Sequence, residues 1–256
     1  MRLRLLGFAL VTLFFLLAAA ILWPASALAP WVERGSNGHW RLSNTEGSVW
    51  NGNGIILTHS SDGAAWHIAQ SIRWQLRWEE LWRGRIAVET TYDQGSSLIA
   101  ATSDGFLIEK IDASLPAPML LVLLPGALGR YSWGGSIQLR GSSFRCTWQT
   151  DACNGEIELL WNDAAVAEVP GSTLGDYRFR LVGEGRALRT DLSTLRGRLQ
   201  INGSGEITVN GLRFKGEAAA SGSDVAALDA MLRTLGSPSG TPGRYLIDYR
   251  ETGTGR

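Results

Sequence analysis

IRWQLRW, residues 72–78, carries the clearest periodicity in this chain of 256 residues. Large apolar side chains occupy every second position, and arginine or glutamine fills the positions between them. Because successive side chains of a β-strand point to opposite faces, a period of two predicts a half-buried antiparallel strand. We expect Ile72, Trp74, Leu76 and Trp78 to form one apolar face of a sheet.

Further short strands are expected on both sides of this run. Glycine is very frequent, with 31 residues, and the 11 tryptophans favour strands and need large apolar surfaces to pack against. Turn residues separate the alternating runs, as in an antiparallel meander. The strands are predicted at residues 40–46, 55–58, 72–78, 86–92, 106–111, 136–140, 144–148, 156–161, 177–182, 186–191, 197–203, 205–211, 212–218 and 243–249.

Two segments break the strand pattern and predict short helices. The apolar run 119–124 follows a Pro-Ala-Pro sequence and is too short to cross a bilayer, so we expect a short buried helix there. Later, Ser223 and Asp224 can cap a helix over residues 225–235, with Gly236 at its C-terminal end. The apolar residues of this second helix recur on one face, which predicts that it docks on a sheet.

The two helices divide the chain into halves with the same order of elements. Gly-Arg-Tyr follows each helix, at residues 129–131 and again at 243–245, which is consistent with a duplicated unit. We predict a mainly β protein with antiparallel, glycine-curved sheets in two similar lobes, each closed by a short helix. The first lobe covers residues 39–126 and the second covers residues 127–256.

The N-terminal residues 5–23 are apolar apart from Gly7 and Thr12, and they carry no charge. As a helix this run would span roughly 28 Å, about the thickness of the hydrocarbon core of a bilayer. Arg2 and Arg4 precede it, and positive residues stay on the cytoplasmic side. We therefore expect residues 1–23 to form a cytoplasmic tip and transmembrane anchor, residues 24–38 a linker, and the lobes to lie outside the cytoplasm.

A cleavable signal peptide is the alternative interpretation of the N-terminus. The small residues at 25–27 and at 27–29 both resemble cleavage sites. The apolar run is longer, however, than the roughly 7–15 residues that are usual in a signal peptide. This length favours an uncleaved anchor.

The sequence GSVWNG, residues 47–52, predicts a tight turn or bulge between two strands. Glycines on both sides of Trp50 allow the indole to fold back onto a sheet face. We treat Gly47, Ser48, Trp50 and Gly52 as a structural motif rather than as a chemical site.

Cys146 and Cys153 are the 2 cysteines of the chain. Their spacing fits no common zinc pattern, and no pair of histidines lies nearby. Outside the cytoplasm, two such neighbours are expected to form a disulfide. The bridge would join the strands predicted at 144–148 and 156–161.

The sequence contains no constellation that indicates catalysis. His39, His59 and His67 have no metal-ligand spacing, and motifs for hydrolases, metalloproteases or phosphate binding do not occur. Lys and Arg total 24 and Asp and Glu total 24, and no basic patch marks a nucleic-acid partner. We expect no cofactor, no metal and no small-molecule substrate.

The chain resembles the type II secretion system protein N family. The resemblance lies in GSVWNG at 47–52, in the glycine-bounded strands of residues 192–218, and in the helix and closing strand of residues 228–248. Members of that family are single-pass inner-membrane proteins with a periplasmic β-rich domain. The resemblance implies an inner-membrane location, other type II secretion components and membrane lipid as partners, and no catalytic residues.

These expectations lead to two hypotheses of function. In the first, the protein is a non-enzymatic accessory or assembly component of the inner-membrane platform of type II secretion, supporting protein export across the outer membrane. In the second, a glycine-curved sheet with Trp-rich apolar faces forms a groove that binds or transfers lipid at the membrane. The sequence alone does not show whether the face of Ile72, Trp74, Leu76 and Trp78 lines a closed core or an open groove.

Overall fold

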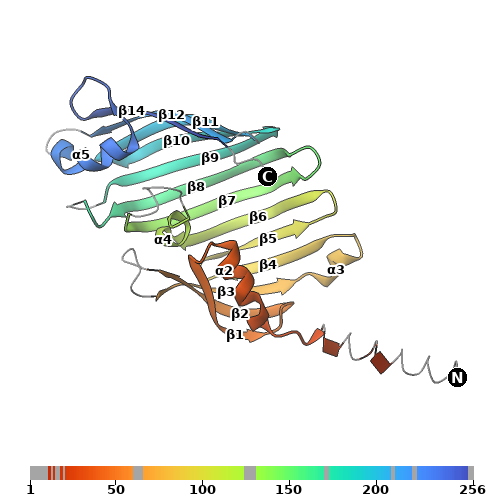
Figure 1. Cartoon of the computed structure of the whole chain (residues 1–256). Helices are drawn as coiled ribbons and strands as arrows, with labels where there is room; N and C mark the ends of the chain where they lie inside the picture. The colour runs from red at the N-terminus through yellow and green to blue at the C-terminus, as the bar shows by residue number, and fades with distance from the viewer. Residues whose placement is uncertain are drawn as a thin grey trace.

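The structure is a computed structural model that describes residues 11, 12, 14, 18, 19, 21–59, 66–123, 131–169, 173–208, 211–220 and 224–252. In this part of the chain a single antiparallel sheet contains 14 strands (Figure 1). Each strand from β1 to β12 pairs with the next in sequence, and β14 and then β13 complete the far edge. The strands are β1 Trp40–Gly47, β2 Asn51–His59, β3 Trp66–Leu76, β4 Ile86–Tyr92, β5 Gly95–Ala101, β6 Gly105–Pro116, β7 Trp133–Thr147, β8 Ala152–Val166, β9 Gly175–Gly185, β10 Ala187–Gly197, β11 Leu199–Thr208, β12 Gly211–Ala220, β13 Ser237–Pro238 and β14 Arg244–Thr252.

The sheet passes without a break through the boundary that the sequence predicts between two lobes. β6 and β7, which flank that boundary, pair from Gly105 opposite Thr147 to Pro116 opposite Ser136. The prediction of an antiparallel, mainly β fold is confirmed, but the expectation of more than one sheet is wrong. The division into lobes at residues 126 and 127 stays a prediction, and most of the repeated Gly-Arg-Tyr at 129–131 lies outside the described residues.

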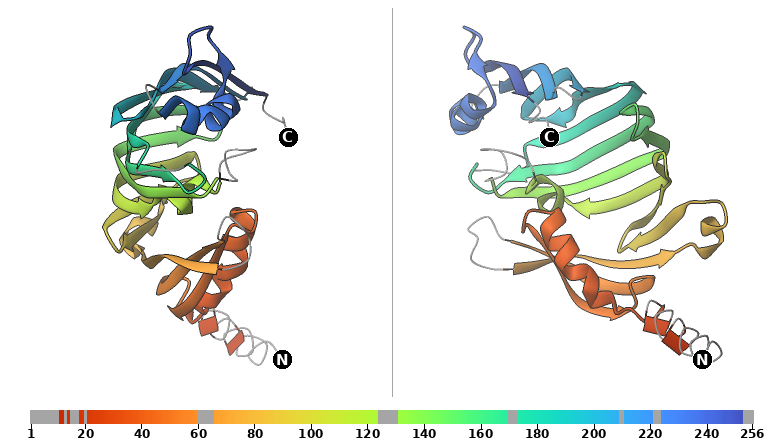
Figure 2. Two further views of the ribbon diagram at one scale, coloured as in Figure 1. Left: turned by 90° about the vertical axis from the view of Figure 1, so that its left-hand side faces the viewer. Right: turned by 45° about the vertical axis from the view of Figure 1, so that its right-hand side comes forward.

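The sheet is strongly curved, and the described helices, except the one in the connection between β3 and β4, lie on its concave side (Figure 2). The short helices are η1 Ala25–Leu28, α2 Ala29–Gly35, α3 Trp78–Leu81, α4 Ala117–Leu121 and α5 Asp224–Leu235. Helices η1 and α2 pack on β1, α4 packs on β6 and β7, and α5 packs on β12 and β14. The helices predicted near 119–124 and at 225–235 are therefore present as α4 and α5. The linker expected at 24–38 contains η1 and α2.

Two hydrophobic clusters lie between the concave face and these helices. The first joins Ala25 of η1 and Met119 of α4 to apolar residues of β1, β2, β3 and β6. The indole nitrogen of Trp40 donates a hydrogen bond of 2.8 Å to the carbonyl oxygen of Met119, which ties the first strand to α4. The second cluster joins Leu228, Met231 and Leu232 of α5 to strands of the C-terminal half.

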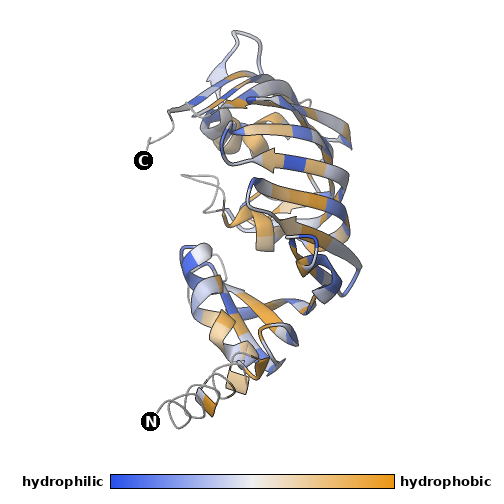
Figure 3. Ribbon diagram, turned by 90° about the vertical axis from the view of Figure 1, so that its right-hand side faces the viewer, coloured by the Kyte–Doolittle hydropathy of each residue, from blue (hydrophilic) through white to orange (hydrophobic). Residues whose placement is uncertain are grey.

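The convex face of the sheet is polar and carries ion pairs between neighbouring strands. Arg180 of β9 lies 2.7 Å from Glu156 of β8, and Arg244 of β14 lies 3.0 Å from Glu217 of β12. Similar pairs recur along this face. Exposed pairs of this kind contribute little free energy. The charged side chains of these pairs keep the convex face hydrated. In Figure 3, polar and apolar residues alternate along the strands.

The structure differs from the predicted elements at several places. β5 was not predicted, and the runs at 136–140 and 144–148 form the one strand β7. The glycine-separated runs at 197–203 and 205–211 likewise fall mostly within one strand, β11. Among the described residues, no helix is long and apolar enough to cross a bilayer. Most of the apolar run 5–23 lies outside the described residues, so the transmembrane anchor stays a prediction.

Candidate functional site

The concave face of the sheet is mostly apolar, with a few buried polar residues such as Gln70 and Ser97, and we consider it the candidate site. Ile72, Trp74 and Leu76 lie on this face in β3, and Trp74 and Leu76 are 6% and 5% exposed. Trp74 belongs to the first hydrophobic cluster, and Ile72 packs against it. Ile72, Trp74 and Leu76, which were predicted to share one apolar face, therefore lie on the side of the sheet that the helices cover.

Trp78 does not belong to that face, which corrects the predicted strand. The pairing of β3 with β2 ends at Gln75 opposite Asn51, and Arg77 is the residue that precedes helix α3. The Leu76 N–H still donates to the Trp50 carbonyl oxygen and the Arg77 N–H to the Ala87 carbonyl oxygen, and the chain leaves the sheet after Arg77. Trp78 begins α3, is 50% exposed and packs its ring 5.7 Å from that of Trp50.

The GSVWNG motif forms the turn between β1 and β2 and holds the end of β3. Gly47 has φ +85°, and a Cβ built on it would lie 2.5 Å from the carbonyl oxygen of Asn51. A Cβ on Gly52 would lie 2.7 Å from the indole of Trp74. That indole donates a hydrogen bond of 3.2 Å to the carbonyl oxygen of Ser48. The glycines of the motif are therefore required by close packing, and the motif has a structural role.

Glycines also shape the concave face near its C-terminal end. Added Cβ atoms on Gly203, Gly205 and Gly216 would lie 2.7, 3.0 and 3.2 Å from the ring of Phe214. The Phe214 ring thus lies close over the backbone of β11 and β12. Because small residues are required beneath a ring at this distance, these glycines belong within continuous strands instead of marking their ends.

The middle of the concave face is only partly covered. Leu159, Phe179, Leu181 and Leu192 alternate with charged or polar residues on β8, β9 and β10 and share the face of buried Tyr177. All are partly exposed. Within the described residues, the helices pack mainly on β1, β6, β7, β12 and β14, so these leucines and Phe179 lie between α4 and α5. None of the four was predicted to be a site residue, although EIEL at 156–159 and YRFRL at 177–181 alternate as clearly as residues 72–76.

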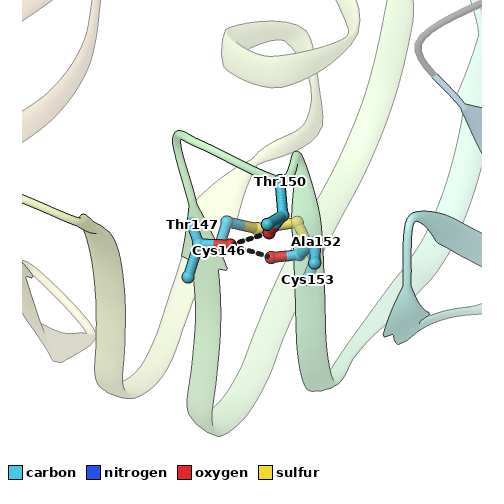
Figure 4. Close-up of a disulfide and its surroundings, with 5 residues drawn as sticks. All are labelled: Cys146, Thr147, Thr150, Ala152 and Cys153. Atoms are coloured by element: carbon cyan, nitrogen blue, oxygen red, sulfur yellow. Dashed lines mark hydrogen bonds between the residues drawn. A yellow bond between two sulfur atoms is a disulfide. The ribbon is translucent and has the colours of Figure 1, made fainter.

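Cys146 and Cys153 face each other across the hairpin of β7 and β8 and are joined by a disulfide (Figure 4). The hydroxyl groups of Thr147 and Thr150 lie 2.6 Å apart in the same turn. Thr147 Oγ1 also donates a hydrogen bond of 3.3 Å to the carbonyl oxygen of Ala152. The turn is therefore held by both covalent and polar contacts.

Polar groups near the candidate site have structural partners. The Asp163 backbone N–H donates a hydrogen bond of 2.8 Å to Asp176 Oδ1, and Arg196 donates to Oδ2. The Asp163 N–H and then the Arg196 guanidinium lower the pKa of Asp176 below its ordinary value. Burial raises the pKa of Tyr177, whose hydroxyl donates to the carbonyl oxygen of Leu199 at 2.8 Å.

The described residues contain no cluster of three or more His, Cys, Asp or Glu that could hold a metal ion. His39 precedes β1, and His59 and His67 lie on the neighbouring strands β2 and β3, where His59 packs its ring 3.7 Å from that of Trp66. The Glu80 carboxylate is paired with Arg83 and Arg85. The candidate site is therefore described by the curved apolar surface of the concave face, with ion pairs on the convex face.

The sequence model of the type II secretion system (T2SS) protein N family matches residues 38–247. This range begins just before β1 and ends within β14, so it includes nearly the whole sheet and α5. Comparison with curated proteins and comparison with solved structures each gave no match. Because the family match extends over most of the chain, the protein belongs to the type II secretion system protein N family.

Proposed function

We propose that this protein is a non-enzymatic accessory or assembly component of the inner-membrane platform of the type II secretion system. Residues 1–23 form a single-pass anchor in the inner membrane, and the curved sheet lies in the periplasm. Its partners are other type II secretion components and inner-membrane lipid, with no nucleic acid and no small-molecule substrate.

The observation that carries this proposal is the extent of the family match, which coincides with the sheet. The match therefore extends over the folded sheet and is not confined to a short segment. β1 and β13 lie at the two edges of the sheet. Strand edges offer backbone groups to a partner chain, which suits an assembly role.

Complementation of a strain that lacks the protein tests the role in export. The wild-type chain should restore secretion of a type II substrate. Alanine variants at each Asp, Glu, His, Ser and Cys should support secretion in proportion to the amount of folded protein. Each variant is scored for secreted substrate, protein level and co-purifying subunits. One variant that abolishes export while staying abundant, folded and bound to its partners would contradict the non-enzymatic role.

A second candidate function is favoured by the partly exposed middle of the concave face. Phe179 and Leu181 of β9 present apolar surface between α4 and α5 on a face that is otherwise buried. Such a groove could hold the acyl chains of a lipid, because apolar surface is removed from water on both partners. In this function the membrane-tethered protein binds or transfers lipid in the periplasm.

Mass spectrometry of the gently solubilised full chain tests this second function. A lipid complex should appear for the wild type and be reduced in Leu181→Asp, which places a charge on the concave face. Val182→Asp is the matched control, since Val182 is the next residue of β9, faces Glu156 on the convex side and is equally partly buried. Equal lipid content in both folded variants would exclude the groove as the lipid site.

A further inference from the structure

One end of the sheet carries most of its exposed aromatic side chains. In an antiparallel meander successive connections alternate between the two ends of the strands. The β1–β2, β3–β4, β5–β6, β7–β8 and β9–β10 connections therefore share one end, which Figure 1 shows at the same side as the N-terminus. We call this end the aromatic rim; its rings are those of Trp23, Trp50, Trp78, Trp82, Phe106 and Trp148.

Direct contacts join the connections of the rim into one surface. The Trp50 ring packs on Trp78 at 5.7 Å, and the Phe106 ring packs on Trp148 at 5.5 Å. A depression of about 350 Å³ next to Phe106 is lined by the β3–β4 and β5–β6 connections and the end of β7. Arg186 of the β9–β10 turn donates a hydrogen bond of 3.0 Å to the carbonyl oxygen of Thr150 in the β7–β8 turn.

Four of the six rings of the rim are at least half exposed, and the rings of Trp50 and Phe106 are partly buried. Trp82 is 94% exposed, and Trp148 is 56% exposed. A tryptophan side chain is large and mostly apolar, so nearly full exposure to water is unfavourable. Tryptophan concentrates instead at the boundary between lipid headgroups and acyl chains, where its apolar ring is buried and its N–H stays hydrated. Exposed rings gathered at one end of a molecule mark a surface that is covered in use.

The path of the chain identifies what covers the rim. Pro24 forms a β-bridge with Ser48, and the Val49 N–H donates a hydrogen bond of 2.9 Å to the carbonyl oxygen of Trp23. Trp23, the last residue of the apolar run, therefore meets the sheet at the rim. If this run is in the bilayer, the rim is the part of the sheet that lies nearest to the membrane surface.

We propose that the aromatic rim docks on the outer surface of the inner membrane, with Trp82 and Trp148 inserted among the lipid headgroups. This inference rests on the proposed N-terminal anchor and adds a second contact with the bilayer. The anchor alone would hold the sheet at one point, where Pro24 meets Ser48. Two contacts hold the sheet at one angle to the membrane, with its strands directed away from the surface.

The charges of the rim identify the class of lipid. Arg77 is paired with Glu79 at 2.7 Å, and Arg83 is paired with Glu80 at 2.8 Å. Arg85 is paired with Glu80 and Glu109. Arg186 of the rim donates to the Thr150 carbonyl oxygen instead of a carboxylate. Because the other three arginines already have carboxylate partners, docking should depend mainly on the rings. It should therefore occur on zwitterionic phosphatidylcholine or phosphatidylethanolamine and respond weakly to salt.

Depth measurements on the full chain in vesicles test the docking. Trp82→Cys and Trp148→Cys are labelled with an environment-sensitive fluorophore, since the native cysteines are joined to each other. The matched control is Ile68→Cys, because Ile68 is 71% exposed and lies in β3 toward the β2–β3 connection, at the other end of the sheet. The vesicles are phosphatidylcholine that carries a nitroxide quencher near the top of one acyl chain.

Labels at 82 and 148 should be quenched at least about three-fold more than the label at 68, because the rim reaches the headgroup boundary. Quenching at 82 and 148 that equals quenching at 68 would overturn the docking. Alkaline extraction of the same vesicles reports the anchor separately. Protein that resists extraction but shows no rim quenching supports the anchor and refutes the rim, while extractable protein with quenched rim labels refutes only the anchor.

Photocrosslinking in cells separates lipid from protein as the occupant of the rim. A photoreactive residue in place of Trp82 should form adducts with phospholipid, and the same residue in place of Ile68 should not. An adduct at position 82 with a secretion subunit, in the absence of lipid adducts, would overturn the proposal and make the rim a protein-binding surface.

Discussion

Asp176 is the one charged side chain in the described part of the chain that is almost fully buried, with 8% exposure. It accepts a hydrogen bond from the Asp163 N–H at the point where the register of β8 and β9 shifts. Asp163 itself has φ +50°. The Asp176 carboxylate therefore has two partners: it holds the irregular backbone at Asp163, and it forms an ion pair with the Arg196 guanidinium.

Asp176→Asn should lower the free energy of unfolding by about 1–3 kcal/mol at pH 7, the usual cost of weakening a buried charged hydrogen bond. The pKa of Asp176 is lowered in the folded state, so its stabilisation is present above its unfolded pKa and is lost as the pH falls through its folded pKa. Urea unfolding should show the difference between wild type and variant shrinking below about pH 4. Asp248→Asn, at an exposed pair with Arg250, is the control and should change stability little. A difference that is as large at pH 3 as at pH 7 would contradict this role.

Gly203→Ala tests the packing of Phe214 on the sheet. The new Cβ would lie 2.7 Å from the ring and 2.6 Å from the carbonyl oxygen of Lys215, so backbone or ring must shift. We expect a loss of about 1–3 kcal/mol, typical of overpacking. Thermal unfolding measures it, with Gly35→Ala as control because nothing lies within 4 Å of a Cβ there. Equal melting temperatures for the two variants would show that Phe214 does not constrain Gly203.

Single residues also show the limit of prediction from sequence. Ile72, Trp74 and Leu76 were predictable, since alternation depends only on strand geometry. Trp78 continues the same alternation, but it lies in α3 and not in β3. The residue at which β3 ends depends on its pairing with the neighbouring strands. Gly203 and Gly205 were predicted to bound separate strands, yet they lie inside β11 beneath a ring of β12. A contact between strands cannot be inferred from either strand alone.

At the scale of elements, the hairpin of β7 and β8 depends on its disulfide. Converting both Cys146 and Cys153 to Ser should lower the stability by roughly 2–3 kcal/mol in the chain-entropy model. Export should fall only as far as the amount of folded protein falls. Thiol labelling of the denatured, non-reduced wild type checks the bridge itself, and two reactive thiols would show that it is absent. A reductant should destabilise the wild type and leave the double variant unchanged.

Helix α5 stabilises the C-terminal half by covering the concave face. Leu228 and Leu232 are 0% exposed within the second hydrophobic cluster. Leu232→Ala should cost about 2–5 kcal/mol, as expected for a buried leucine. Denaturant unfolding measures this, and Arg233→Ala on the exposed side of the helix is the control. A loss in Leu232→Ala no larger than that in the control would mean that α5 contributes little to the fold.

The elements differ in how well the sequence predicts them. α5 was predictable because its caps and apolar face are local signals. β5 was missed, since Gly95-Ser96-Ser97 begins it with small residues that resemble a loop. β7 was divided into two strands at Gly141-Ser142-Ser143, where Ser143 has φ +55° and the register shifts. A local irregularity inside a long strand has the same sequence signal as the end of a strand.

At the scale of the whole molecule, the anchor and the sheet are expected to stay covalently joined. Protein recovered from membranes should begin at residue 1 or 2 and resist extraction at high pH, because the apolar run is long and is preceded by arginines. N-terminal sequencing and fractionation measure both properties. A chain that begins at Leu28 or Pro30 would show cleavage and leave the sheet without its anchor.

The whole architecture was less predictable than its parts. Mainly antiparallel strands follow from alternation and turn residues, but a run of strands fits two sheets as well as one. The choice depends on whether β6 pairs with β7, which are separated by α4 and residues 122–132. The partial exposure of Leu159 and Phe179 depends in turn on which strands the helices cover. Such placement follows only from the complete fold.

The order of the strands has a consequence for how the protein is made. Each strand from β1 to β12 pairs with the one before it in sequence, so its partner has already been synthesised when it appears. A chain whose strands emerge in sequence order can therefore add one strand at a time to a growing sheet. Loop closure over short distances costs little entropy and favours rapid folding. At each stage the unpaired backbone of the growing sheet is then confined to its two edges, β1 and the newest strand.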